Sequence, residues 1–172
     1  MELFVLNRDQ APNFVFNDPY IVISIVTDEG DWPKLAKHEN LKGVLRLWFH
    51  DLDDGVIDAI DNARVFNLQM ANRVLDFVCR HEKDIKAVMV HCEAGISRSA
   101  GTMAALTKVF GWGDDQVWFD RKRPNMKVYR KILDTAAERG YIGVDEKGKI
   151  VRQRAFERIN EDAKTRDQPI RF

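Results

Sequence analysis

The sequence predicts an α/β fold, a single-domain three-layer sandwich in which helices flank a mainly parallel central sheet. Its 172 residues are enough for one domain with a sizeable core. Four short runs are apolar throughout, as strands buried on both faces tend to be, and helical patterns lie between and after them. Strands that alternate with helices are typical of a parallel sheet. The predicted strands are Leu3–Leu6, Tyr20–Val26, Val44–Phe49 and Ala87–His91.

Helix signals of different strength lie between these strands. Asp31–Lys37 carries a proline, Pro33, in what would be the first turn of a short capped helix. From Phe66 to His81 the apolar side chains fall on one face of a helix of about four turns. Asn67 is placed to serve as the N-cap of that helix.

The C-terminal half is predicted to be mostly helical. Arg98–Phe110 is rich in small apolar residues, which suit close packing against a sheet. A short helix is expected between Asp114 and Pro124, and Asn125 caps the helix that follows, which stops at Gly140. A weak, highly charged helical pattern from Ile150 to about Ala163 makes the segment from Gly140 to residue 172 an expected C-terminal helical extension of the single domain.

Composition excludes several classes of function. Lys and Arg together number 27, and Asp and Glu also number 27, so no net charge steers the protein toward nucleic acid or a membrane surface. Two cysteines are too few for a disulfide scaffold and favour a reduced, cytoplasmic protein. The N-terminus lacks a signal-peptide pattern, and no apolar run approaches membrane-spanning length. We therefore expect a monomer in the cytoplasm with neither a nucleic-acid nor a membrane partner.

The segment from Val88 to Ser99 carries the chemistry. Cys92 follows an apolar strand, Gly95 lies in the next loop, and Arg98 begins a helix. Positive surroundings favour the thiolate, which is the nucleophilic form of cysteine, and a phosphate dianion needs the same surroundings. Gly95 permits a loop whose N–H groups curl inward, and the guanidinium binds two oxygens at once. The pattern predicts a site that holds phosphate against sulfur, and the alternative is a buried structural cysteine.

These residues resemble a known family. His91-Cys92, followed by five residues and Arg98-Ser99, is similar to the HCX5R loop of the cysteine-dependent protein tyrosine phosphatases, and the intervening residues look most like the dual-specificity branch. An Arg-Pro-Asn triplet ending at Asn125, followed by an amphipathic helix, is similar to the family's C-terminal pattern. The resemblance covers roughly residues 20 to 138.

The resemblance implies a two-step hydrolysis of phosphomonoesters. The Cys92 thiolate attacks phosphorus, a phosphocysteine intermediate forms, and a carboxylic acid protonates the leaving group and then activates water. Ser99 helps the thiolate to leave, and His91 orients the loop. No metal or other cofactor is needed, because the loop amides and the arginine neutralise the transferring group. The residues implied to bind phosphate are Glu93, Ala94, Gly95, Ile96, Ser97 and Arg98.

The general acid is expected on the loop after a neighbouring strand. Asp51 directly follows the strand that ends near Phe49 and aligns best with the family, while Asp53 and Asp54 compete with it. Asp51 lies further before Cys92 than is usual in compact family members, so an enlarged loop is expected over residues 55–65.

The resemblance implies a phosphorylated protein or peptide as substrate, with phosphotyrosine first and phosphoserine or phosphothreonine as alternatives. The loop residues Glu93, Ala94 and Ile96 add no positive charge, which disfavours inositol phospholipids. The alternatives are a catalytically silent phosphate-binding module, a phosphatase for a non-protein phosphomonoester, and a sulfurtransferase, which the spacing fits poorly.

Two features outside the loop have two interpretations each. Cys79 is either a packed core thiol or a partner that protects an oxidised Cys92. Arg121, Lys122 and Arg123 either form a basic rim that favours acidic or doubly phosphorylated substrates, or complement the end of a helix.

Overall fold

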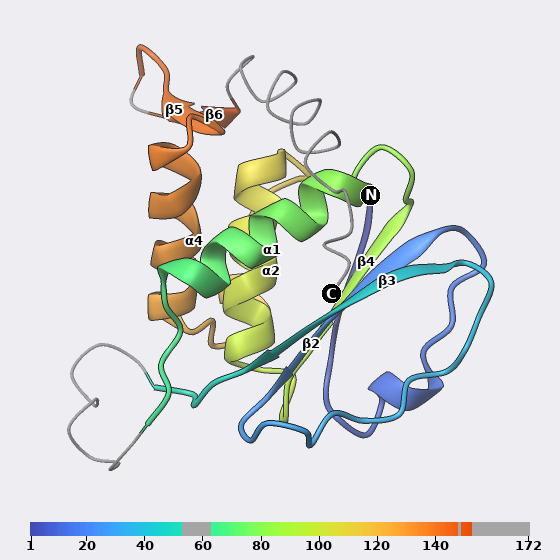
Figure 1. Ribbon diagram of the computed structural model, residues 1–172. Coiled ribbons are helices and arrows are strands. Elements are labelled where there is room, and N and C mark those ends of the chain that lie inside the picture. The colour runs from blue at the N-terminus through green and yellow to red at the C-terminus, as the bar shows by residue number, and fades with distance from the viewer. Residues whose placement is uncertain (53–62, 148, 153–172) are drawn as a thin grey trace, which may run out of the picture.

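A sheet of four parallel strands forms the centre of the computed structural model, which describes residues 1–52, 63–147 and 149–152 (Figure 1). The strand order is β1-β4-β2-β3, and every neighbouring pair is parallel. The α/β class and the parallel sheet are therefore confirmed. The strands are β1 (Glu2–Leu6), β2 (Tyr20–Val26), β3 (Leu41–Trp48) and β4 (Ala87–His91).

Burial follows the position of each strand in the sheet. Every residue of the two central strands, β2 and β4, is buried, which explains why their sequences are apolar without alternation. The edge strand β3 is only partly buried and carries exposed side chains. It starts three residues before the predicted strand and ends one residue earlier, because its exposed positions weaken the apolar signal.

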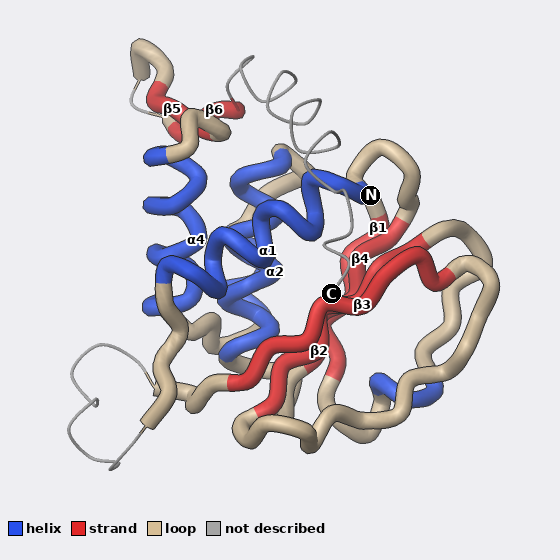
Figure 2. Tube along the Cα trace, viewed as in Figure 1, coloured by secondary structure: helices blue, strands red, loops and turns tan. Residues whose placement is uncertain are grey.

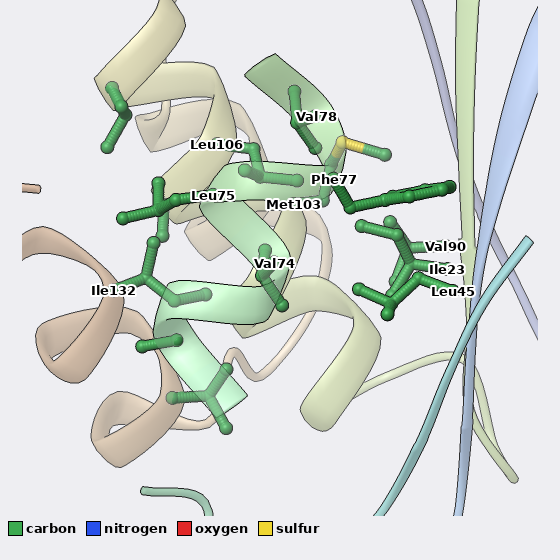
Figure 3. Close-up of a cluster of buried hydrophobic side chains, with 14 of the residues drawn as sticks. Ile23, Leu45, Val74, Leu75, Phe77, Val78, Val90, Met103, Leu106 and Ile132 are labelled. Carbon is green, nitrogen blue, oxygen red and sulfur yellow. The ribbon is translucent and has the colours of Figure 1, made fainter. Parts of the chain in front are cut away.

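Three long helices cover one face of the sheet (Figure 2). They are α1 (Leu68–His81), α2 (Arg98–Phe110) and α4 (Met126–Glu138). Figure 3 shows their side chains meeting those of the sheet in the main core. Fully burying one such side chain stabilises the fold by about 1.5–3 kcal/mol. The labelled residues come from the sheet (Ile23, Leu45, Val90), α1 (Val74, Leu75, Phe77, Val78), α2 (Met103, Leu106) and α4 (Ile132).

Loops and one short 3-10 helix, η1 (Ala11–Asn13), cover the opposite face in the described residues (Figure 2). A second apolar cluster lies beneath them, in which Tyr20 and Met89 are buried and Leu35 packs against the buried group. The helix predicted over Asp31–Lys37 is wrong, because this segment has no helical structure. A helix this short is marginal by itself, and tertiary contacts decide its path.

Asparagine caps begin two of the helices as predicted. Asn67 Oδ1 accepts the N–H of Met70 at 3.0 Å at the start of α1. Asn125 Oδ1 accepts the N–H of Val128 at 2.9 Å at the start of α4. Between α2 and α4 lies the short helix α3 (Gln116–Arg121), which begins two residues after the predicted start.

Beyond α4 the chain departs from the predicted helical extension. Gly140 follows the helix with φ 70°, the left-handed conformation expected of a residue that ends a helix. Two short antiparallel strands, β5 (Ile142–Val144) and β6 (Ile150–Arg152), come next. The helix expected from Ile150 is therefore wrong at its first three residues, and its remainder lies outside the described residues. None of the described helices is long and apolar enough to span a membrane.

Candidate active site

The carboxyl ends of the four parallel strands meet at one edge of the sheet, where ligand sites form in open α/β folds. Cys92 follows β4 there, in a loop that leads into α2. Its side chain is buried, and its sulfur lies 3.0 Å from Ser99 Oγ in the first turn of α2. The hydroxyl is therefore placed to donate a hydrogen bond to a thiolate. The structure brings together the two residues that the sequence predicted as nucleophile and hydroxyl partner.

Backbone contacts hold Glu93–Ser97, the loop predicted to bind phosphate and called the phosphate-binding loop below, on both sides. Gly95 has φ 67°, and a Cβ there would lie 2.7 Å from backbone atoms of Leu6 and Asn7 at the end of β1. On the other side, the carbonyl of Ser97 accepts N–H groups from Gly101 at 2.8 Å and from Asn125 at 3.1 Å. A glycine is required at position 95 for both its conformation and its space.

Arg98 is buried at the start of α2 with 3% of its surface exposed. Its Nη1 donates to Thr27 Oγ1 at 3.1 Å and to the carbonyl of Phe49 at 2.7 Å. Its Nε is buried and has no hydrogen-bond partner among the described residues. An unsatisfied buried donor costs about 1–3 kcal/mol. The guanidinium is thus anchored from two strand ends while one donor stays available for an anion.

Asp51 follows β3, and its side chain contacts the phosphate-binding loop. Its Oδ1 accepts hydrogen bonds from Ser97 Oγ at 2.6 Å and from Asn125 Nδ2 at 2.9 Å. Its Oδ2 lies 3.9 Å from Arg98 Nε. The side chain keeps 40% exposure, so a carboxyl next to the unused donor of Arg98 remains open to solvent. The competing Asp53 and Asp54, and most of the enlarged loop expected over 55–65, lie outside the described residues.

His91 is wholly buried directly before the nucleophile. Its Nε2 shares a hydrogen bond of 2.7 Å with Ser24 Oγ on β2. Burial lowers the pKa of His91 to about 4, well below the ordinary histidine value. The ring is therefore neutral at neutral pH, and its hydrogen bond to Ser24 links β4 to β2.

A charged cluster ties the end of β1 to the phosphate-binding loop. The Arg8 guanidinium binds Asp31 through two hydrogen bonds of 2.7 Å, and its Nη1 also lies 3.1 Å from Glu93 Oε1. The backbone N–H of Arg8 donates to the carbonyl of Glu93 at 3.1 Å. The hydrogen bonds to Asp31 are the main cause that raises the pKa of Arg8. Arg8 thereby offsets a carboxylate within the loop that would otherwise repel a phosphate.

Four contacts of the site were not anticipated from the sequence. Ser24, Thr27 and Arg8 lie at or just after strand ends, where side chains on neighbouring parallel strands converge. Asn125 was predicted only as a helix cap, yet its other amide atom reaches Asp51. For Ser24, Thr27 and Arg8 the position near a strand end was the available signal, and the strand order was needed to use it.

The remaining sequence candidates lie at the margin of the site or away from it. The N–H of Arg123 donates to the carbonyl of Ile96 at 3.2 Å, so the basic triplet borders the loop through its backbone. Cys79 is buried in α1 near Tyr141, and burial raises the pKa of its thiol to about 12. It lies near the end of α1 that leads into β4, whereas Cys92 follows β4, and five strand residues span about 17 Å. This placement disfavours the protective role for Cys79.

No group of three or more metal-ligating side chains gathers in the parts of the chain that the structure describes. The donors that converge at the sheet edge are hydroxyl, amide and guanidinium groups around the sulfur of Cys92 and the carboxylate of Asp51. This donor set is suited to an oxyanion.

Comparison with known proteins places this arrangement in a familiar fold. No family model and no curated protein matches the sequence. The human tyrosine phosphatase-like serine/threonine/tyrosine-interacting protein superposes with a TM-score of 0.53 at 20% identity, covering 80% of this chain and 92% of that one. Tk-PTP in its active form gives 0.49 at 15% identity, covering 77% and 90%. PTPMT1 in complex with PI(5)P gives 0.49 at 17% identity, covering 80% and 91%.

The first of these superpositions covers most of both chains. At such low identity it establishes the fold alone. The chain therefore shares the fold of this tyrosine phosphatase-like protein, which agrees with the fold that the resemblance to the dual-specificity branch implied.

Proposed function

We propose that this protein is a phosphomonoester hydrolase of the protein tyrosine or dual-specificity type. The observation that supports this most is the arrangement around Arg98. The guanidinium is anchored by Thr27 and Phe49, and its buried Nε has no hydrogen-bond partner among the described residues. Arg98 follows the loop that begins with Cys92, and Asp51 Oδ2 lies 3.9 Å from its Nε. Such a donor, at the N-terminal end of a helix, is suited to a tetrahedral anion.

The proposed reaction has two displacements. The Cys92 thiolate attacks phosphorus, the bond from phosphorus to the ester oxygen breaks, and Asp51 gives its proton to the departing oxygen. Water then attacks the phosphocysteine, Asp51 takes a proton from that water, and inorganic phosphate leaves. Ser99 donates a hydrogen bond to the departing thiolate. The loop amides and Arg98 stabilise the charge on the transferring group in both steps.

The surroundings of the loop favour a phosphoprotein over a highly phosphorylated headgroup. The carboxylate of Glu93 forms an ion pair with Arg8, so the positive charge of Arg8 is already neutralised. Ile96 exposes 43% of its surface within the loop, which offers an apolar contact for an aromatic ring. A phosphotyrosine peptide is thus the proposed substrate, and a cytoplasmic monomer accords with the even charge and the two free cysteines.

Hydrolysis of an aryl phosphate in the presence of a metal chelator tests the proposal. We expect the wild type to turn over the ester, vanadate to inhibit it, and Cys92→Ser to abolish it. Cys79→Ser is the matched control, since it removes the other cysteine at a buried position far from the loop and is expected to retain turnover.

An inert wild type, or full turnover by Cys92→Ser, would contradict the proposal. If the wild type binds vanadate in calorimetry without hydrolysing the ester, the chain is instead a phosphate-binding module. Turnover of short-chain phosphoinositides at a higher kcat/KM than phosphotyrosine peptides would overturn the substrate assignment while leaving the reaction intact.

A further inference from the structure

Asn125 joins three parts of the site. It lies between Pro124 and α4 with 2% of its surface exposed. Its backbone N–H donates to the carbonyl of Ser97 in the phosphate-binding loop at 3.1 Å. Its side-chain Oδ1 caps α4 by accepting the N–H of Val128 at 2.9 Å. The residue is thus held by the loop and by the helix at the same time.

The cap decides which way the amide faces. Because Oδ1 is taken by the N–H of Val128, Nδ2 must point to the opposite side. There it donates to Asp51 Oδ1 at 2.9 Å and to the carbonyl of Leu52 at 3.3 Å. A flipped amide would bring its oxygen against the carboxylate and leave the N–H of Val128 unsatisfied. Asn125 is therefore a fixed donor toward the loop that carries the acid.

The backbone of Asn125 lies so close to α2 that the helix must carry a glycine at this point. A Cβ at Gly101 would lie 2.5 Å from the carbonyl oxygen of Asn125 and 3.1 Å from its backbone nitrogen. No side chain therefore fits between α2 and this segment. The backbone of Asn125 thus sits against the helix that begins with Arg98, and its amide reaches the carboxylate from there.

The two oxygens of Asp51 are consequently different. Oδ1 accepts from both Ser97 Oγ and Asn125 Nδ2, so its lone pairs are occupied. Oδ2 has no hydrogen bond to any residue that the structure describes, and it lies 3.9 Å from Arg98 Nε. A transferable proton on this carboxyl belongs on Oδ2, the oxygen on the side of the phosphate-binding arginine.

We propose that Asn125 is a positioning residue, which together with Ser97 holds Asp51 so that Oδ2 delivers the proton to the leaving group. This inference rests on the proposed function, because it requires Asp51 to act as the general acid. It predicts that loss of the amide impairs proton transfer specifically, rather than phosphate binding or attack by Cys92.

Asn125→Ser separates the two roles of this side chain. Serine is as good an N-cap as asparagine, but it is too short to reach Asp51 through its hydroxyl. Asn67→Ser is the matched control, because Asn67 makes the same cap at the start of α1, with Oδ1 3.0 Å from the N–H of Met70. Both variants are assayed on 4-nitrophenyl phosphate, whose leaving group needs little protonation, and on phenyl phosphate, whose leaving group needs it.

We expect Asn125→Ser to lower kcat/KM for phenyl phosphate by about tenfold or more, within the contribution of a general acid, and kcat/KM for 4-nitrophenyl phosphate by less than about threefold, because kcat/KM reports the first displacement and not the hydrolysis step that both esters share. Asn67→Ser should leave the ratio of the two rates unchanged. In an Asp51→Asn background, Asn125→Ser should add no further loss, because residues that act through one another are not additive.

An equal loss on both esters, an unchanged ratio, or a full further loss in the Asp51→Asn background would overturn the inference. Wild type that hydrolyses neither ester refutes the proposed function instead, so the two failures are distinguishable. If thermal unfolding shows that Asn125→Ser does not fold, Asn125→Thr takes its place. Threonine also caps a helix through its side-chain oxygen, is too short to reach Asp51, and carries the same expectations.

Discussion

His91 shows at the scale of one residue how burial decides the state of a titratable group. The ring has no solvent exposure and is bonded to Ser24 across two neighbouring strands. Transfer of a charged imidazolium to this position would be costly, so burial lowers the pKa of His91 to about 4. The residue beside Cys92 is thus a neutral side chain that links β4 to β2 through one hydrogen bond.

The lowered pKa of His91 predicts a loss of stability in acid. An unfolded chain carries this histidine with a pKa of about 6.5, so between pH 6.5 and 4 the unfolded state binds more protons than the folded state. The free energy of unfolding therefore rises with pH across this window, and His91 should account for a loss of about 2 kcal/mol between pH 7.5 and pH 5.

Urea unfolding at the two pH values measures this loss in the wild type and in His91→Gln, whose amide does not titrate. Burial also lowers the pKa of His81, so His81→Gln serves as the control and should retain the part due to His91. Equal losses in the wild type and in His91→Gln would show that the buried ring is not the cause.

The loop between β4 and α2 depends, as an element, on one glycine. Gly95 and Gly140 have nearly the same backbone conformation, with φ 67° and φ 70°. They differ in space, because a Cβ at position 95 would overlap the backbone of Leu6 and Asn7, whereas no atom of the described residues would crowd one at position 140 within 4 Å. Alanine substitutions at these two positions therefore separate the free-energy cost of the left-handed conformation from the cost of the overlap with neighbouring backbone.

Gly140→Ala is expected to lower the free energy of unfolding by about 1–2 kcal/mol, the cost of a left-handed conformation. Gly95→Ala should cost more, because the loop must also move away from the end of β1. It should abolish vanadate binding, whereas Gly140→Ala should retain it. Chemical denaturation and a vanadate titration measure the two effects, and wild-type vanadate affinity in Gly95→Ala would contradict this account of the loop.

The two cysteines differ at the scale of the whole molecule because they lie toward opposite ends of β4. Cys92 follows the carboxyl end of β4, where the strand-end loops converge, and Cys79 is packed on α1 toward the other end of the same strand. Burial raises the pKa of Cys79 to about 12, so its thiolate is scarcely populated at neutral pH. Both side chains are buried, and they differ in that Cys92 lies in the loop at the sheet edge whereas Cys79 is packed within a helix.

This separation predicts the reaction of the protein with an aromatic disulfide reagent. In Cys92→Ser the remaining thiol should react only as fast as the protein unfolds, and quickly in urea. In Cys79→Ser the Cys92 thiol should react in the folded protein, and vanadate should slow that reaction. Absorbance of the released thiolate measures both rates. Rapid labelling of folded Cys92→Ser would contradict the buried placement of Cys79.

Much of the fold was predictable because the signals that specify it are local. The central strands β2 and β4 matched their predicted bounds, since strands buried on both faces are apolar at every position. The caps at Asn67 and Asn125 were predictable because a cap acts within one turn of its helix. The helix predicted over Asp31–Lys37 was wrong, because Arg8 binds Asp31 from a distant part of the chain. A short helix is too weakly stable by itself to compete with such contacts.

The sequence by itself determined the loop from His91 to Ser99, because nucleophile, glycine, arginine and hydroxyl are close neighbours in the chain and their spacing specifies a local geometry. Only the tertiary structure decided what surrounds that loop. Asp51 reaches Ser97 and Asn125, and Thr27 anchors Arg98, only because the parallel strands bring their carboxyl ends to one edge. Contacts between segments far apart in the chain follow from strand order and packing, and neither leaves a periodic mark in the sequence.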